Sequence, residues 1–213
     1  MKLLREITMV SMRNRGESVH KTIKTHYDKE YENKIEPDEK NAIENYQIDS
    51  GDVNDYHWKK HKKEDISRMN KENVEDIENK TKGIDSVMNK SKTPHKLHVY
   101  SGTIHDPRYI KNDEGIVHHP AFLSTTVNET YGRLRAKSLA NRTGATEEHM
   151  LKIHVPKDHP GIYMPSASPD AVGANESERE FMLPRGTNLK HIKTTREEGT
   201  RKNLNIHHMK VVP

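Results

Sequence analysis

The chain has 213 residues, of which 31% are hydrophobic and 32% are charged, with a formal net charge of +4 and no cysteine. The low apolar fraction predicts a modest core beside a long polar segment. The absence of cysteine excludes disulfides, thiolate catalysis and Cys-based zinc sites. The mildly basic balance suits an acidic partner, a nucleic acid or a phosphate-rich cofactor, without choosing among them.

Residues 1–36 lack a clear hydrophobic period, and they predict a polar arm that is flexible or partly helical. Arg5 and Glu6 interrupt the apolar residues at the N-terminus before a core of signal-peptide length forms. No stretch approaches the ~20 apolar residues of a membrane span. We therefore expect a soluble protein without a signal peptide that acts in a cytoplasm and does not enter a membrane.

Residues 37–93 predict a small helical lobe. Pro37 followed by acidic residues is typical of a first helical turn. The turn at residues 49–52 favours the start of a second, short helix. A third helix is expected over residues 72–89, which carry an apolar stripe at helical spacing, and Pro94 ends it.

Residues 94–213 show short apolar runs separated by turns, which is typical of strands. Asn128 is expected to cap a helix that reaches about Leu139. The expected strands lie at residues 97–100, 120–126, 150–155, 161–164, 181–183, 188–193 and 206–212, with a loop at 165–177. Many short strands with few helices predict a two-sheet β core of the sandwich kind, so the fold class is α+β.

Two glutamates stand directly before the apolar run at residues 181–183. On a strand, residues two apart share a face, so Glu178 and Glu180 are expected side by side with Arg179 pointing away. Their proximity should raise the pKa of one carboxyl, and such pairs mark sites that handle protons or developing positive charge. Taken alone, a Glu-x-Glu pair is more often a solvated surface.

Three motifs resemble those of mono-ADP-ribosyltransferases of the Arg-Ser-Glu class, in the order of that family. Leu97–Gly102 resembles its first strand, Phe122–Thr126 resembles its Phe-x-Ser-Thr-Ser/Thr motif, and Glu178–Thr187 resembles its last motif. The resemblance covers about residues 38–213 and is greatest to tailed-phage and toxin-type arginine-specific members. It implies a helical N-terminal lobe packed on a split β-sandwich that binds NAD.

The resemblance also implies the roles of single residues. Glu180 would be the catalytic residue, Ser124 would hold Glu180 by a hydrogen bond, and Glu178 would position or deprotonate the acceptor. The implied cofactor-binding residues are Ser101, Gly102, Thr125, Thr126 and Arg108. No metal is required, because nicotinamide leaves as a neutral molecule from a cation.

One position departs from the family pattern. Ser101 stands where the family has an NAD-binding arginine, so Arg108, or Arg133 or Arg135 on the following helix, is expected to reach the pyrophosphate instead. The adjacent pairs His118-His119 and His207-His208 would point to opposite faces of strands, which favours surface or packing roles over a metal site.

The implied activity is transfer of ADP-ribose from NAD, with release of nicotinamide, to an arginine side chain of a target protein in a bacterial host cell. The basic balance leaves an RNA acceptor open. An NAD glycohydrolase, with water as acceptor, is a second hypothesis. A non-catalytic binding module with a degenerate ADP-ribosyltransferase fold is a third, which Ser101 favours and the intact glutamate pair opposes.

Overall fold

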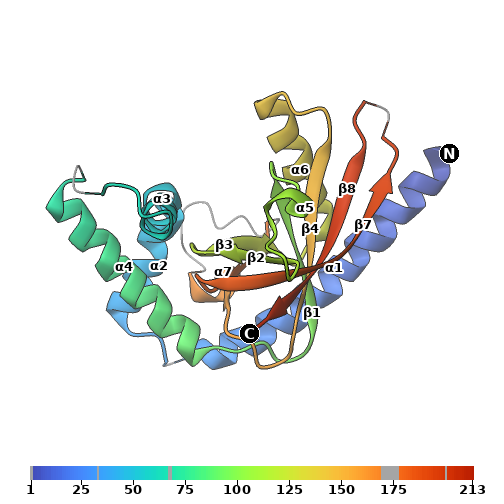
Figure 1. Ribbon diagram of the computed structural model, residues 1–213. Helices are drawn as coiled ribbons and strands as arrows, with labels where there is room; N and C mark the ends of the chain where they lie inside the picture. Colours follow the sequence, from blue (N-terminus) through green and yellow to red (C-terminus); the bar gives the residue numbers. More distant parts are fainter. Residues whose placement is uncertain (1, 33, 67–68, 169–177, 200) are drawn as a thin grey trace.

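The computed structural model describes residues 2–32, 34–66, 69–168, 178–199 and 201–213 (Figure 1). Its helices are α1 (Lys2–Tyr31), α2 (Pro37–Ile48), α3 (Ser50–His61), α4 (Lys71–Lys90), α5 (Pro107–Ile110), α6 (Glu129–Thr143) and α7 (Met164–Ala167). Its strands are β1 (Leu97–Thr103), β2 (Ile116–His119), β3 (Leu123–Thr126), β4 (Glu148–Val155), β5 (Ile162–Tyr163), β6 (Glu180–Leu183), β7 (Thr187–Glu197) and β8 (Leu204–Val212).

The strands form an eight-stranded sheet in the order β2-β7-β8-β4-β1-β3-β6-β5. Strand β4 runs parallel to β8, and the other neighbouring pairs are antiparallel. Figure 1 shows β3 lying across the direction of β4 and β8. The α+β class predicted from the sequence is confirmed, and the two halves of the expected sandwich are joined through β1, whose pairing with β3 is limited to Tyr100 opposite Thr126.

Helix α1 is the largest difference from the predicted elements. The sequence predicts a flexible or partly helical arm over residues 1–36, whereas a helix extends to Tyr31. Ile23, Tyr27 and Tyr31 recur every four residues and are buried. The ring of Tyr27 contacts those of Tyr163 and Phe181, at centroid distances of 6.1 Å each. The end of this segment is therefore part of the core.

The helical lobe follows the prediction closely. Helix α2 begins at Pro37, and the Asn70 side chain caps α4 by accepting a hydrogen bond from the backbone N–H of Glu72. Figure 1 shows α2, α3 and α4 grouped together beside the β3 end of the sheet. Tyr46 of α2 packs edge-on against Phe122, with ring centroids 5.6 Å apart, so lobe and sheet share one hydrophobic core.

The second half contains three elements that the sequence did not predict, β2 and the short helices α5 and α7, the last of which lies where a strand end and a loop were expected. Helix α6 was predicted, and Asn128 caps it by accepting a hydrogen bond from the backbone N–H of Thr130 at 3.1 Å. Residues 169–177 of the predicted loop lie outside the described residues. Within the described segments, no helix is both long and apolar enough to cross a membrane.

Candidate active site

Strands β3 and β6 place the predicted catalytic residues. In their antiparallel pairing, Thr126 lies opposite Glu180 and Ser124 lies opposite Met182. Ser124 and Glu180 are thus diagonal neighbours on one face, within reach of each other's side chains. The Ser124 hydroxyl donates a hydrogen bond of 2.5 Å to Oε1 of Glu180. The contact expected from the sequence is therefore present.

The half-buried carboxyl of Glu180 has a strongly perturbed environment. Burial raises its pKa to about 7, the Ser124 hydrogen bond lowers it, nearby Glu178 raises it and Arg135 lowers it. The buried run from Phe181 to Leu183 anchors this residue in the core. A carboxyl fixed in this way is suited to stabilising positive charge that develops beside it.

Glu178 reaches the same region by a different backbone path from the one predicted. Strand β6 begins at Glu180, and Arg179 has a left-handed backbone with φ of 46°. Glu178 therefore lies in a turn, not on a strand beside Glu180. The Thr126 hydroxyl holds this turn by donating to the Glu178 carbonyl at 2.5 Å. Arg179 points elsewhere and pairs with Glu17 of α1.

The two threonines after Ser124 support this arrangement. Both are buried, and the Thr125 hydroxyl donates a hydrogen bond to the carbonyl of Phe181. Together with the Thr126 contact, this bond fixes β3 against the segment that carries both glutamates. The pocket-shaping role expected of Thr125 and Thr126 agrees with these positions, and their contact with NAD stays a prediction.

A pocket of about 130 Å³ lies between β1, β3 and α6. It is lined by Tyr100, Ser101, Gly102, Ser124, Thr125, Thr126, Tyr131, Gly132, Arg135 and Glu178. Glu180 adjoins it through Ser124. The structure therefore brings together all the predicted site residues except Arg108.

Helix α6 contributes Tyr131, to which the sequence analysis assigned no role, and Arg135, one of the three arginines considered for the pyrophosphate. The Tyr131 hydroxyl donates a hydrogen bond of 2.8 Å to Oε1 of Glu178, while burial and that contact raise the pKa of Tyr131 to about 12. Arg135 lies one helical turn after Tyr131 and lines the same pocket. Their spacing of four residues places them on one helix face, and this spacing is the sequence signal by which the pair could have been found.

Ser101 and Gly102 lie at the pocket edge for reasons of packing. The Ser101 hydroxyl donates to the carbonyl of Ser124 at 3.0 Å. A Cβ atom on Gly102 would stand 2.6 Å from the backbone N of Ala136 on α6. The missing side chain of Gly102 thus lets α6 pack on β1, and the contact of Ser101 and Gly102 with NAD stays a prediction.

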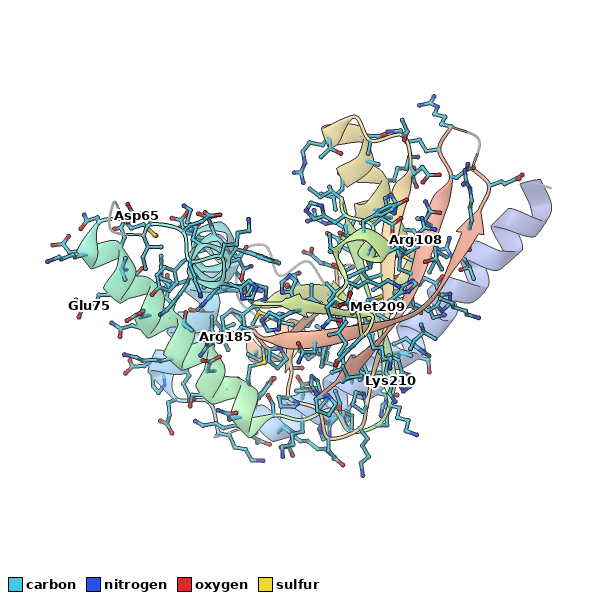
Figure 2. All side chains as sticks on the ribbon, in the orientation of Figure 1. Asp65, Glu75, Arg108, Arg185, Met209 and Lys210 are labelled. Carbon is cyan, nitrogen blue, oxygen red and sulfur yellow. The ribbon has the colours of Figure 1, made fainter. Side chains whose placement is uncertain are left out.

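Arg108 does not reach this pocket. It lies on α5, and its guanidinium is paired with Asp106, with 2.5 Å between Nη2 and Oδ2 (Figure 2). Arg133 is also engaged, because it pairs with Glu129 at 2.7 Å and with Glu197 at 2.6 Å. Of the three arginines considered for the pyrophosphate, Arg135 alone lines the pocket. The structure thus places Arg135, and not Arg108, at the pocket, while contact of an arginine with the pyrophosphate stays a prediction.

The adjacent histidines point to opposite faces of β8, as predicted. The His207 ring is fully buried and contacts His149 and Thr194 at 2.9 Å each, whereas His208 contacts Thr195. Asp106, His149 and His207 each offer one possible metal-ligand atom, and these atoms lie within 4.8 Å of one another. Asp106 already pairs with Arg108, with 2.5 Å between Nη2 and Oδ2. This cluster is explained as a packed polar network.

Comparisons with known proteins identify a family and a fold. The sequence model of the ADP-ribosyltransferase exoenzyme family matches residues 24–211. The fold is similar to Plx2a, an ADP-ribosyltransferase toxin from Paenibacillus larvae, with TM-score 0.66, 17% identity and coverage of 94% of this chain and 96% of that chain.

Two further solved structures share the fold. An ADP-ribosyltransferase from Clostridium botulinum gives TM-score 0.63 at 18% identity, covering 91% of this chain and 95% of that chain. The ADP-ribosyltransferase Vis, solved in complex with agmatine, gives TM-score 0.65 at 16% identity, covering 94% of this chain and 86% of that chain. A search of curated proteins by sequence finds no match.

Proposed function

Because the chain belongs to the ADP-ribosyltransferase exoenzyme family and transfers ADP-ribose from NAD, we propose that its acceptor is an arginine side chain of a protein. The observation that carries this proposal is the position of Glu178. Its carboxylate lines the pocket beside Glu180 and is held there by the Tyr131 hydroxyl. A second carboxylate at this point can bind a cationic acceptor that enters the pocket.

Glu180 acts on the donor half of the reaction. When the bond between nicotinamide and ribose breaks, its electron pair leaves with neutral nicotinamide and the ribose becomes an oxocarbenium-like cation, as in glycoside hydrolysis. The Glu180 carboxylate stabilises that cation, and Ser124 keeps it oriented. A preorganised group of this kind is typically worth ~3–4 kcal/mol in the transition state.

Glu178 acts on the acceptor half. An arginine guanidinium is protonated at neutral pH, so it is attracted by a carboxylate and must lose a proton before its nitrogen bonds to the ribose carbon. Glu178 binds the guanidinium and takes that proton. The similarity to Vis supports this choice, because the structure of Vis contains agmatine, which carries the same guanidinium group as arginine.

Arg135 supplies the positive charge that the pyrophosphate of NAD requires. It lines the pocket, whereas Arg108 and Arg133 are committed to carboxylates. A guanidinium matches phosphate oxygens with two parallel hydrogen bonds. We propose that Arg135 takes the role of the arginine that the family has at the position of Ser101. The cytoplasmic location expected from the sequence stays a prediction.

The test uses NAD labelled in its adenosine part, the full chain, an arginine-rich acceptor protein, and a matched acceptor in which each arginine is lysine. Label should appear only on the arginine-bearing protein, and agmatine should compete for it. Glu180→Gln should abolish both label transfer and nicotinamide release. Glu178→Gln should abolish transfer while nicotinamide release continues.

Other outcomes decide between the hypotheses. Label on the lysine-bearing protein would contradict the arginine acceptor. Release of nicotinamide with no label on any protein, and no loss in Glu178→Gln, would favour an NAD glycohydrolase. Label on added RNA would move the acceptor to nucleic acid. The mapped site of modification, by mass spectrometry, gives the acceptor atom directly.

A further inference from the structure

A second concentration of charge lies on the sheet, outside the lining of the pocket that contains Glu178, which we call the glutamate pocket. It is formed by residues on β1, β4, β8 and β7, which are neighbours in the sheet. We call it the cationic face, and its members are His98, Lys152, His154, Lys190, Lys193, His208 and Lys210. All are basic or can become cationic.

The register places these residues directly opposite one another. Lys152 pairs with His208, and His154 pairs with Lys210, across β4 and β8. Across β7 and β8, Lys193 pairs with His208 and Lys190 pairs with Lys210. His98 stands opposite His154 across β1 and β4. Facing residues on neighbouring strands lie on one face, and like charges there repel each other.

Acidic partners for the lysines of this face are missing from the part of the chain that the structure describes. Among those residues, no ion pair involves Lys152, Lys190, Lys193 or Lys210. The acidic residue that acts on His98 and His208 is Glu129, whose carboxylate is already bound by Arg133. The positive charge is therefore left without compensation from this part of the chain.

The face is also hollowed. A pocket of about 320 Å³ is lined by His98, Lys152, His154, Ile192, Lys193, His208, Met209 and Lys210. None of these residues is acidic. Ile192 is 56% exposed, and the rings of His98 and His154 lie 5.3 Å apart. Figure 2 shows Met209 and Lys210 on β8, where this hollow lies. The hollow thus combines cations with imidazole rings and apolar surface.

We propose that the cationic face binds the phosphate backbone of a single-stranded nucleic acid. Four neighbouring strands at about 4.8 Å spacing carry the charge over about 14 Å, which is longer than one phosphate group and suits a linear polyanion. The histidine rings and the apolar lining offer stacking surface for a base, as sequence-tolerant single-strand binders use. An acidic protein segment, by contrast, carries no nucleobase that could stack in the hollow.

This inference does not rest on the arginine acceptor. The cationic face shares no side chain with the lining of the glutamate pocket. Binding to it is measured without NAD. Failure of one proposal therefore leaves the other standing.

The test is the anisotropy of short labelled RNA and DNA oligonucleotides of mixed sequence, titrated with the full chain at several salt concentrations near pH 8. Each phosphate neutralised on a single strand adds about −0.7 to the slope of log K against log salt. Four lysines predict a slope of about −3. Lys152→Gln, Lys193→Gln and Lys210→Gln together should reduce it to about −0.7 and weaken binding at least about tenfold at low salt.

The matched control removes the same charge elsewhere. Lys40, Lys59 and Lys62 each pair with a nearby carboxylate on the helical lobe. Changing these three to Gln should leave both slope and affinity within about twofold of the wild type. Thermal unfolding of both triple variants, expected at the wild-type temperature, shows that the comparison is between folded proteins.

Three results would overturn the proposal. Equal weakening of oligonucleotide binding in both triple variants would mean that the loss of net charge alone explains the effect. Equal affinity for polyglutamate of matched charge would assign the face to an acidic protein. Displacement of the oligonucleotide by tripolyphosphate at the same affinity would assign it to a small phosphate ligand.

Discussion

Two regions of this protein bring like charges close together, and they treat those charges in opposite ways. In the glutamate pocket, each carboxylate is held by a hydroxyl of the protein, Glu180 by Ser124 and Glu178 by Tyr131. On the cationic face, the lysines have no ion-pair partner among the described residues. Fixed carboxylates are suited to reacting atoms, whereas lysines without such a partner are suited to an external polyanion.

The difference also appears in what each region gives up in stability. A carboxyl whose pKa is raised by burial destabilises the fold when it is ionised. A protein retains this loss of stability where the charge is needed for chemistry. Lysines on an exposed sheet face cost little, because solvent screens them. The pocket is therefore where substitution should change chemistry most, and the face is where it should change binding and salt dependence.

The largest effect is expected at Glu180. Glu180→Gln keeps the shape but removes the charge that stabilises the ribose cation, so kcat should fall about 10³-fold. The same change should stabilise the fold near pH 8, by on the order of 1–3 kcal/mol, because Gln removes an ionised carboxylate whose pKa the fold raises. Nicotinamide release and thermal unfolding measure the two effects, and loss of activity together with loss of stability would contradict the assignment.

Glu178→Gln should separate the two halves of the reaction. Transfer to an arginine acceptor should fall about 10²-fold, because base assistance and guanidinium binding are lost. Hydrolysis of NAD without acceptor should stay within about threefold of the wild type, since Glu180 and Ser124 are intact. An equal decrease in both rates would show that Glu178 acts on NAD itself.

Ser124→Ala should have a smaller effect with a distinct pH signature. The loss of one oriented hydrogen bond to a carboxylate predicts about a tenfold decrease in kcat. The wild-type rate should rise with pH through about 7, as Glu180 ionises. Because the serine lowers the pKa of Glu180, the midpoint in the variant should move to higher pH. An unchanged midpoint would argue against this contact in solution.

Tyr131→Phe should have the smallest effect of the four. It removes one hydrogen bond to Glu178 and keeps the ring, so transfer to arginine should decrease about three- to fivefold. KM for the arginine acceptor should rise, and KM for NAD should not change. Tyr109→Phe, on an exposed tyrosine of α5, is the matched control and should leave both constants as they are.

Much of this arrangement could be predicted from local patterns. The start of α2 at Pro37 and the Asn128 cap follow from turn chemistry and capping, and the contact between Ser124 and Glu180 is implied by the family resemblance. These features depend on residues close in sequence or on motifs with a fixed pairing. The predicted α+β class follows from the change of pattern after residue 93.

The failures involve one long-range contact and two local arrangements that the sequence patterns did not indicate. The buried stripe of α1 has one apolar residue per turn between charged ones, so the segment looks polar until β5 and β6 are in place. The motif that contains Arg179 has the sequence pattern of a strand, and this pattern gives no sign of the left-handed backbone at Arg179. Arg108 does not reach the pocket because its side chain pairs with Asp106, two residues away. Asp106 caps α5, and this role brings the two side chains together.

The ion pair between Arg179 and Glu17 has an evolutionary consequence. It ties the turn that carries Glu178 to the first helix, which lies at the opposite end of the chain. A change of sign at position 17 would therefore be tolerated best with a compensating change at position 179. Such a pair should be inherited together, even in lineages whose acceptors differ.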